Sequence, residues 1–409
     1  MKSIIRNKFI ELLDKIPLAK NLARKKFISS FILGLIDSRK VQFNEIAIHI
    51  ESTAKLESVE RNIQSFFKDY DFDYQQVCLL LLMFLPKGKL SLSIDRTEWD
   101  FGEYQCNILM IVAKSGSIGI PLYWELLDNN SGNSCCPDRC HLLEKLIQVI
   151  GKERIGAIVG DREFIGLQWV KYLKDNKIHF CMRIPKSHLI TLKNDESYTI
   201  SELLEKKTER YFQDCLVDGI WCNVMLKKLP DNEFLFLMGS IPAKQLGSFY
   251  RRRWCIEVLF QTFKERGFDL ESTHLKCSKK LSKLLVFVSI AVALCVKVGE
   301  YYHGKVQRIK IKKHGYKANS FFRKGLDIVR RGLKNTTKEF LQLWQECVSI
   351  FIRWTDYKFL IINILQKYSG RVQFWIIFCI LYFLTVSPSK VNTATLFNIL
   401  ASNKITLLK

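Results

Sequence analysis

The sequence has 409 residues, of which 48% are hydrophobic, so the chain can bury a sizeable core and is not a disordered protein. Length alone predicts two or three domains. The formal net charge of +23, from 63 Lys and Arg against 40 Asp and Glu, indicates a polyanionic partner, either nucleic acid or an anionic membrane surface. The thirteen cysteines include no CxxC pair, and the first 20 residues lack the apolar core of a signal peptide, so we expect a reducing, intracellular setting.

The first 86 residues predict a helical domain. Apolar residues recur at intervals of three and four, as in VERNIQSFFKDYDFDYQQVCLLLLMFLP, and Pro86 ends the run. From Lys89 the period changes to two in LSLSID, and the stretches QCNILMIVAKSG and IGIPLYWELLD follow with the turn-like SGSIG between them. This pattern predicts three consecutive strands.

The next hundred or so residues predict β–α–β units and then a β-rich insertion. PDRCHLLEKLIQVI and IGLQWVKYLKDN have helical spacing, whereas IGAIVGD (155–161) and HFCMRIPKS suit buried strands. We therefore expect a mixed α/β layer architecture, in which three meandering strands are extended by β–α–β units and flanked by helices. Residues 188–240 are polar with strand-like pieces, and helical spacing resumes at Pro242.

Two apolar runs test the alternative of a membrane protein. Residues 284–298 and 372–386 are fifteen residues each, short of the roughly 20 that cross a bilayer as a helix, so we predict buried core helices. The second run is flanked by Arg371 and Lys390, which resemble interfacial anchors, and it keeps a membrane-surface protein among the alternatives.

The segment 305–334 carries eleven basic residues and one acidic residue. Such a segment can be a solvated helix face or loop. Contacts to phosphates are the usual reason to concentrate this much positive charge, so we favour contact with nucleic acid.

Three carboxylates stand where a metal site would need them. Asp95 alternates with the apolar residues of LSLSID and is expected near the end of that strand, and Asp161 ends the strand AIVGD, where ligands gather in open α/β sheets. Glu257 shares a predicted helical stripe with Tyr250, Arg253 and Lys264, beside an apolar stripe of Phe249, Ile256, Phe260 and Phe263. Each carboxylate has a plainer explanation: Asp161 can cap the next helix, and Glu257 can pair with Arg253 on an exposed helix.

Together the three carboxylates predict a phosphodiester-cleaving site. Hydrolysis by two Mg²⁺ ions needs hard oxygen ligands from several elements, and Asp95, Asp161 and Glu257 supply that set. The cationic and phenolic members of the stripe would then face the scissile strand and contact its phosphates.

The spacing Tyr250-x2-Arg253-x3-Glu257-x6-Lys264, preceded by Asp95 in DRTEW and Asp161 in GDREF, resembles the bacterial cut-and-paste insertion-sequence transposases of the DDE class. That group is defined by a Tyr-Arg-Glu-Lys signature. The resemblance covers about residues 40–345, and VERNIQSFF looks like the family's helical end-binding region. It implies a ribonuclease H-like core with a β-strand insertion before the glutamate helix.

The resemblance also implies roles for individual residues. Asp95, Asp161 and Glu257 would be the catalytic, metal-binding residues. Contacts to transposon DNA are implied for Tyr250, Arg253, Lys264 and Arg162, and Glu163 and Trp254 match residues that are common in the group.

The expected cofactor is Mg²⁺, as two ions for which Mn²⁺ substitutes, and the sequence has no Walker-type loop that would indicate a nucleotide cofactor. The expected partners are double-stranded DNA, as transposon ends and target, and a second copy of the chain in the DNA complex, with no membrane. The resemblance places the protein in the bacterial cytoplasm at the nucleoid. The alternatives are an inactive or repurposed DNA-binding protein and a structure-selective nuclease with the same core.

These interpretations give six segments. They are a helical DNA-end-binding domain (1–86), the first part of the catalytic core (87–187), the β-rich insertion (188–240), the core helices with the signature (241–300), a basic helical DNA-binding region (301–348) and an apolar tail (349–409).

Overall fold

The structure is a computed structural model, and it describes residues 2–350 except 17, 102–103, 129–131, 205–206, 231–232 and 314. The chain forms two compact units, Met1–Cys347 and Val348–Lys409. The predicted tail lies outside the described residues from residue 351 onward, and so does its apolar run 372–386.

The N-terminal part is helical, as its periodicity predicts. Polar caps fix the start of two helices: Asn21 accepts a hydrogen bond from the Arg24 amide at 2.8 Å, and Asp73 accepts from Gln75 at 2.9 Å. Buried phenylalanines then hold the helices together, and Phe31 and Phe67 both contact Phe287 of a later helix. The helices are α1 (Lys2–Asp14), α2 (Leu22–Ser38), α3 (Phe43–His49), α4 (Leu56–Asp69) and α5 (Tyr74–Leu82).

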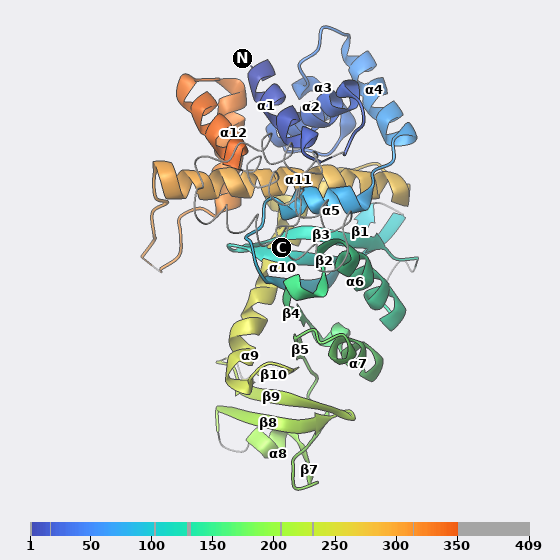
Figure 1. The fold of residues 1–409 in the computed structure, drawn as a ribbon, viewed down its shortest axis with the longest axis vertical. Coiled ribbons are helices and arrows are strands. Elements are labelled where there is room, and N and C mark those ends of the chain that lie inside the picture. The colour runs from blue at the N-terminus through green and yellow to red at the C-terminus, as the bar shows by residue number, and fades with distance from the viewer. Residues whose placement is uncertain are drawn as a thin grey trace, which may run out of the picture. The chain divides into compact units, whose positions relative to one another are not determined.

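A ten-stranded mixed sheet forms the centre, in the order β3-β2-β1-β4-β5-β10-β9-β8-β6-β7 (Figure 1). Strand β2 is antiparallel to β1 and β3, and β4 runs parallel to β1 and β5. The first five strands therefore have the order and directions of a ribonuclease H-like core, and the predicted mixed α/β architecture is confirmed. Their bounds are β1 (Leu90–Phe101), β2 (Tyr104–Ser115), β3 (Ile118–Leu126), β4 (Ile155–Gly160) and β5 (Phe180–Arg183).

The segment 188–240 is β-rich, as predicted, and its strands continue the core sheet from β5 through antiparallel pairing with β10. Sequence periodicity could not show this, because pairing between distant strands leaves no local signal. The elements of the segment are β6 (Leu189–Thr191), β7 (Ser197–Thr199), α8 (Ile200–Leu204), β8 (Glu209–Val217), β9 (Ile220–Lys228) and β10 (Phe234–Gly239).

Helices cover the sheet. Helix α11 lies between the helices α1–α4 and the strands β1–β3 in Figure 1, and α12 packs closely along it. A Cβ on Gly325 would lie 1.8 Å from the Cys295 carbonyl oxygen, so glycine permits this close approach. The helices are α6 (Cys136–Ile150), α7 (Leu167–Asp175), α9 (Ala243–Tyr250), α10 (Trp254–Gln261), α11 (Ser278–Tyr301) and α12 (Phe321–Lys334).

The predicted core helix at 284–298 is confirmed, but it is longer than its apolar run. Helix α11 has 24 residues, because Lys279, Lys280 and Lys283 extend its first turns. Among the described residues, one helix, Ser278–Val306, is long and apolar enough to cross a membrane by length and composition, and 89% of its most apolar window is buried inside the protein. Burial of this extent is what the core helix of a folded domain requires.

Candidate active site

Two of the three predicted carboxylates come from neighbouring parallel strands. Strands β1 and β4 pair as far as Ser93↔Val159, and the same register places Asp95 level with Asp161. Asp161 directly follows the last residue of β4, as predicted. Asp95 does not lie near the end of β1, because the strand stays paired with β2 up to Phe101↔Tyr104.

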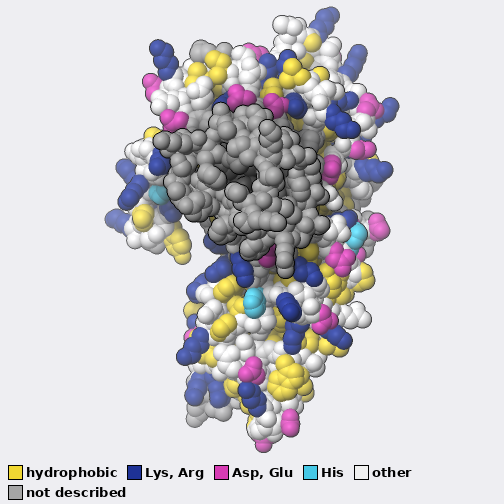
Figure 2. Space-filling model, in the orientation of Figure 1, with side chains coloured by type: hydrophobic (Ala, Val, Ile, Leu, Met, Phe, Trp, Pro, Cys, Tyr) yellow, Lys and Arg dark blue, Asp and Glu magenta, His cyan; other side chains and the backbone are white. Residues whose placement is uncertain are grey.

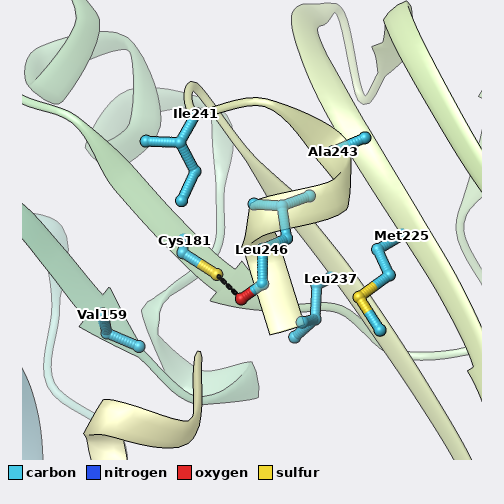
Figure 3. Close-up of a cluster of buried hydrophobic side chains, with 7 residues drawn as sticks. All are labelled: Val159, Cys181, Met225, Leu237, Ile241, Ala243 and Leu246. Atoms are coloured by element: carbon cyan, nitrogen blue, oxygen red, sulfur yellow. Dashed lines mark hydrogen bonds between the residues drawn. The ribbon is translucent and has the colours of Figure 1, made fainter. Parts of the chain in front are cut away.

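The third carboxylate comes from a helical stretch whose geometry is not uniform. Residues 243–266 run through α9, a 3₁₀ turn at Arg251–Arg253, α10 and a π-helical turn at Thr262–Arg266. A buried apolar cluster holds α9 against β4, β5, β9 and β10, and Tyr250 packs against its edge (Figure 3). The cluster comprises Val159, Cys181, Met225, Leu237, Ile241, Ala243 and Leu246. It therefore fixes where the helix enters the site.

The apolar stripe of this helix is confirmed in part. Ile256 and Phe263 are fully buried, whereas Phe249 and Phe260 are half-buried. Ser93, on the polar face of β1, is also buried, and its Oγ lies 3.7 Å from the Cys255 Sγ. Helix α10 thus covers the face of the sheet that carries Asp95.

The guanidinium of Arg253 joins all three carboxylates. Its Nη1 donates to Asp95 Oδ2 at 2.9 Å, its Nη2 lies 3.8 Å from Asp161 Oδ2, and Nη2 also donates to Glu257 Oε1. The Arg253 side chain is only 13% exposed. The structure therefore brings Asp95, Asp161 and Glu257 together around one buried cation.

Burial sets the electrostatics of this cluster. It raises the pKa of Asp95 to about 6, although Arg253 and a 2.8 Å hydrogen bond from the Arg96 amide both stabilise the charged form. Burial likewise raises the pKa of Tyr250 to about 12, and its hydroxyl donates to Asp161 Oδ1 at 3.0 Å. Tyr250 and Arg253 thus point at the carboxylates in this structure.

Asp161 and Glu257 are not explained by helix capping or by a single ion pair. Asp161 occupies the N-cap position of a 3₁₀ turn, Arg162–Phe164, but its side chain makes no capping hydrogen bond. The Arg253–Glu257 ion pair is present, yet Glu257 is only 26% exposed and the same guanidinium also contacts both aspartates. Neither explanation accounts for the convergence.

Two further candidates lie apart from the carboxylates. Lys264 Nζ contacts Glu271 Oε1 at 2.8 Å and the Glu98 carbonyl oxygen at 3.4 Å. The prediction of one stripe assumed a regular helix, and the π-helical turn that contains Lys264 changes the angle between successive residues. Arg162 follows Asp161 and is exposed.

The side chains present fit a divalent metal ion in type but not in their present positions. Three carboxylates from three elements form the hard oxygen set that Mg²⁺ prefers. Within the described ranges, no group of three or more His, Cys, Asp or Glu residues has metal-binding geometry. The Arg253 guanidinium fills the centre of the cluster, so a metal ion could bind only if that side chain moved.

A second network, which the sequence did not predict, lies behind the aspartates. Arg96 Nε contacts Glu163 Oε2 at 3.1 Å, and Glu163 Oε1 accepts from the Ser134 hydroxyl at 2.6 Å. The buried Arg139 donates to that hydroxyl at 2.9 Å. The available signal was Arg96, which directly follows Asp95 in DRTEW, together with Glu163 of GDREF.

The predicted basic segment is helical only in part. Residues 307–320 form a loop closed by an antiparallel bridge between Ile311 and Lys317, and α12 follows. We call this loop the basic loop; it projects at the left of Figure 1, and Lys and Arg side chains gather there in Figure 2. Its exposed cations are Arg308, Lys310, Lys312, Lys313 and Lys317, and Tyr316 is 74% exposed.

Comparison with known proteins gives one family match. Residues 130–294 match the family model described as "Transposase DDE domain", a region that contains Asp161, Arg253 and Glu257 but begins after Asp95. A search of curated proteins found no match. Among solved structures, the chain is similar to one titled "Cryo-EM structure of piggyBac transposase synaptic complex with hairpin DNA", at 12% identity and a TM-score of 0.42, covering 85% of this chain and 84% of that one.

Proposed function

We propose that this chain is a DNA transposase that binds the terminal inverted repeats of an insertion sequence and catalyses metal-dependent strand cleavage and strand transfer. The observation that carries the proposal is the convergence of Asp95, Asp161 and Glu257 on one buried guanidinium. The match of residues 130–294 to the DDE domain of transposases supports the same class of reaction. The proposal retains the bacterial setting, with the protein at the nucleoid in the cytoplasm and dimeric on DNA.

In this proposal the three carboxylates would hold two Mg²⁺ ions, for which Mn²⁺ would substitute, and the ions would supply activation of water and then of a DNA 3′ hydroxyl for attack on a phosphodiester. Asp95 would act as a ligand in its charged form, which burial disfavours. Arg253 must leave the centre of the cluster, and Tyr250 must release Asp161. Both side chains then become available to DNA phosphates.

The DNA contacts we propose lie on cations at two places. Arg162, which is exposed, follows Asp161, and Lys264, which is half-buried, follows Glu257 by seven residues; the basic loop presents its lysines and arginine to solvent. Within the described residues, none of the loop's five exposed cations has a carboxylate within 4.0 Å, so their charge is available to a polyanion.

The first prediction tests the proposal directly. Because each carboxylate would hold metal, Asp95→Asn, Asp161→Asn and Glu257→Gln should each abolish strand cleavage and leave DNA binding largely intact. The substrate is duplex DNA that carries the sequences flanking the gene for this chain, incubated with Mg²⁺ or with EDTA. Glu125→Gln, which removes a carboxylate that pairs with Lys145, is the matched control and should keep full activity.

Three outcomes would change the proposal. Retained cleavage in one carboxylate variant removes that residue from the site. Wild-type protein that binds the ends and never cleaves them favours a repurposed DNA-binding protein. Cleavage of branched or unrelated DNA without strand transfer favours a structure-selective nuclease.

A further inference from the structure

The backbone does not fix the distance between the two aspartates. Strands β1 and β4 stop pairing at Ser93↔Val159, two residues before each aspartate. After that point β1 continues beside β2, while β4 stays paired only with β5, as far as Gly160↔Met182, and then leads into the 3₁₀ turn Arg162–Phe164. Asp95 and Asp161 therefore stand on two segments that diverge, and side chains must set their separation.

The next connection between these segments is the ion pair of Arg96 and Glu163. Arg96 Nε lies 3.1 Å from Glu163 Oε2, and the two side chains are only 15% and 13% exposed. The other oxygen of Glu163 accepts from the Ser134 amide at 2.8 Å and from the Ser134 hydroxyl at 2.6 Å. Both oxygens of the carboxylate are thus held, so the pair is more rigid than a surface ion pair.

The pair lies on the opposite face of the sheet from the carboxylate cluster. Along β1 the side chain of Arg96 alternates with that of Asp95 and shares the face of Ile94, and Glu163 Oε1 of the pair lies 3.9 Å from Arg139 of helix α6. The backbone amide of Arg96 donates to Asp95 Oδ1 at 2.8 Å, so the position of the backbone at Arg96 affects the orientation of Asp95. The pair can therefore orient Asp95 and the turn after Asp161 without reaching a ligand in the cluster.

We infer that Arg96 and Glu163 are positioning residues that join the segments carrying Asp95 and Asp161 and so set the separation of two ligands of the proposed metal site. This inference rests on the proposed function. It assigns the pair no contact with DNA and no proton transfer. Removing a residue that supports a metal ligand commonly lowers metal affinity about 10- to 100-fold. We expect a loss at the lower end of that range.

The test measures Mn²⁺ affinity without DNA, from the electron paramagnetic resonance signal of the free ion. Glu163→Gln is nearly isosteric and removes only the charge, and Arg96→Ala removes the pair from the other side. Both should weaken Mn²⁺ binding by about tenfold, whereas Arg96→Lys, which keeps the charge, should stay within about threefold of wild type. The double variant should lose no more than the worse single variant, because the two residues act as one unit.

Two readouts separate positioning from a general loss of structure. DNA binding in EDTA should be unchanged in Glu163→Gln, and cleavage should recover as the Mn²⁺ concentration is raised. Lys145→Gln, which breaks the 3.1 Å ion pair between α6 and β3, is the matched control and should bind Mn²⁺ as wild type does.

The outcomes for this inference and for the proposed function differ. Folded Glu163→Gln with wild-type Mn²⁺ affinity overturns the positioning role, and circular dichroism establishes that the variant is folded. If Asp95→Asn also leaves Mn²⁺ affinity unchanged, the proposed metal site itself fails. If Mn²⁺ binding weakens in Asp95→Asn but not in Glu163→Gln, the proposed metal site stands and only the positioning role of Arg96 and Glu163 is rejected.

Discussion

At the scale of the residue, Arg253 determines the state of the candidate site. The guanidinium offsets part of the repulsion among three carboxylates that lie close together in a largely buried place. The sequence predicted that these four residues would be neighbours, because their spacing matches a known signature. It could not predict that Arg253 contacts both aspartates as well as Glu257, since the 3₁₀ turn that contains Arg253 has no sequence period.

Replacing Arg253 should make the protein depend on metal for stability. Arg253→Ala leaves three carboxylates without a counter-ion, and we expect the free energy of unfolding in EDTA to fall by about 3 kcal/mol. Mg²⁺ should then stabilise Arg253→Ala more than wild type, because the ion no longer competes with a guanidinium. Urea unfolding with and without Mg²⁺ measures both effects.

The neighbouring Arg252 supplies the control for that comparison. Its guanidinium lies 4.0 Å from the centre of the Phe249 ring, and no contact between it and the three carboxylates is described. Arg252→Ala should therefore respond to Mg²⁺ as wild type does. Equal stabilisation of wild type and Arg253→Ala by Mg²⁺ would contradict the idea that the two cations compete.

The raised pKa of Asp95 predicts a pH dependence of stability. Burial raises this pKa from 3.8 to about 6 in the folded protein, so the folded state holds the proton more tightly than the unfolded state. The free energy of unfolding should consequently fall as pH rises from about 4 to about 6, by at most about 3 kcal/mol, and then level off. Urea unfolding of metal-free wild type against Asp95→Asn isolates this contribution, and parallel curves for the two proteins would refute it.

At the scale of the element, regular periodicity in the sequence predicted individual strands and helices, but it did not predict which strands pair with one another. Alternation in LSLSID predicted the start of β1, but nothing in RTEWDF predicted that the strand continues to Phe101, which follows from pairing with β2. The buried strand β4 and the helix α6 were predicted because their apolar patterns are local. The basic loop was predicted as part of a helical region, and charge alone does not distinguish a helix from a loop.

The basic loop should contribute phosphate contacts that do not depend on DNA sequence. Replacing the exposed residues Lys312 and Lys313 with glutamine should weaken binding to all duplexes alike, and the slope of log K against log salt should become shallower by roughly 0.9 per lost contact. Fluorescence anisotropy across a KCl series measures the slope.

A lysine of similar exposure far from the loop in sequence provides the control. Lys193 is 67% exposed and pairs with Asp214, so Lys193→Gln should leave the salt slope unchanged. A slope that is also unchanged after replacement of Lys312 and Lys313 would make the loop a solvated segment.

At the scale of the whole molecule, residues 1–347 form one compact unit with a continuous core. We therefore expect a chain of residues 1–348 to fold and bind DNA. Solubility, thermal unfolding and binding to the gene-flanking duplex measure this, with the full chain as the comparison. If the apolar run 372–386 is needed by the core, removing it should expose apolar surface, and an aggregated product would show that the tail belongs to the folded unit.

Helix α11 has a consequence for how the protein is made. The strand β3 and the helices α2, α4 and α5 pack against it, yet it is synthesised after all of them. At typical synthesis rates, roughly 10 to 35 seconds separate the completion of β3 from the completion of α11. During that interval the ribosome carries a nascent chain whose apolar surfaces lack their cover, so we expect the yield of folded protein to depend on chaperone supply and on translation speed over residues 127–301.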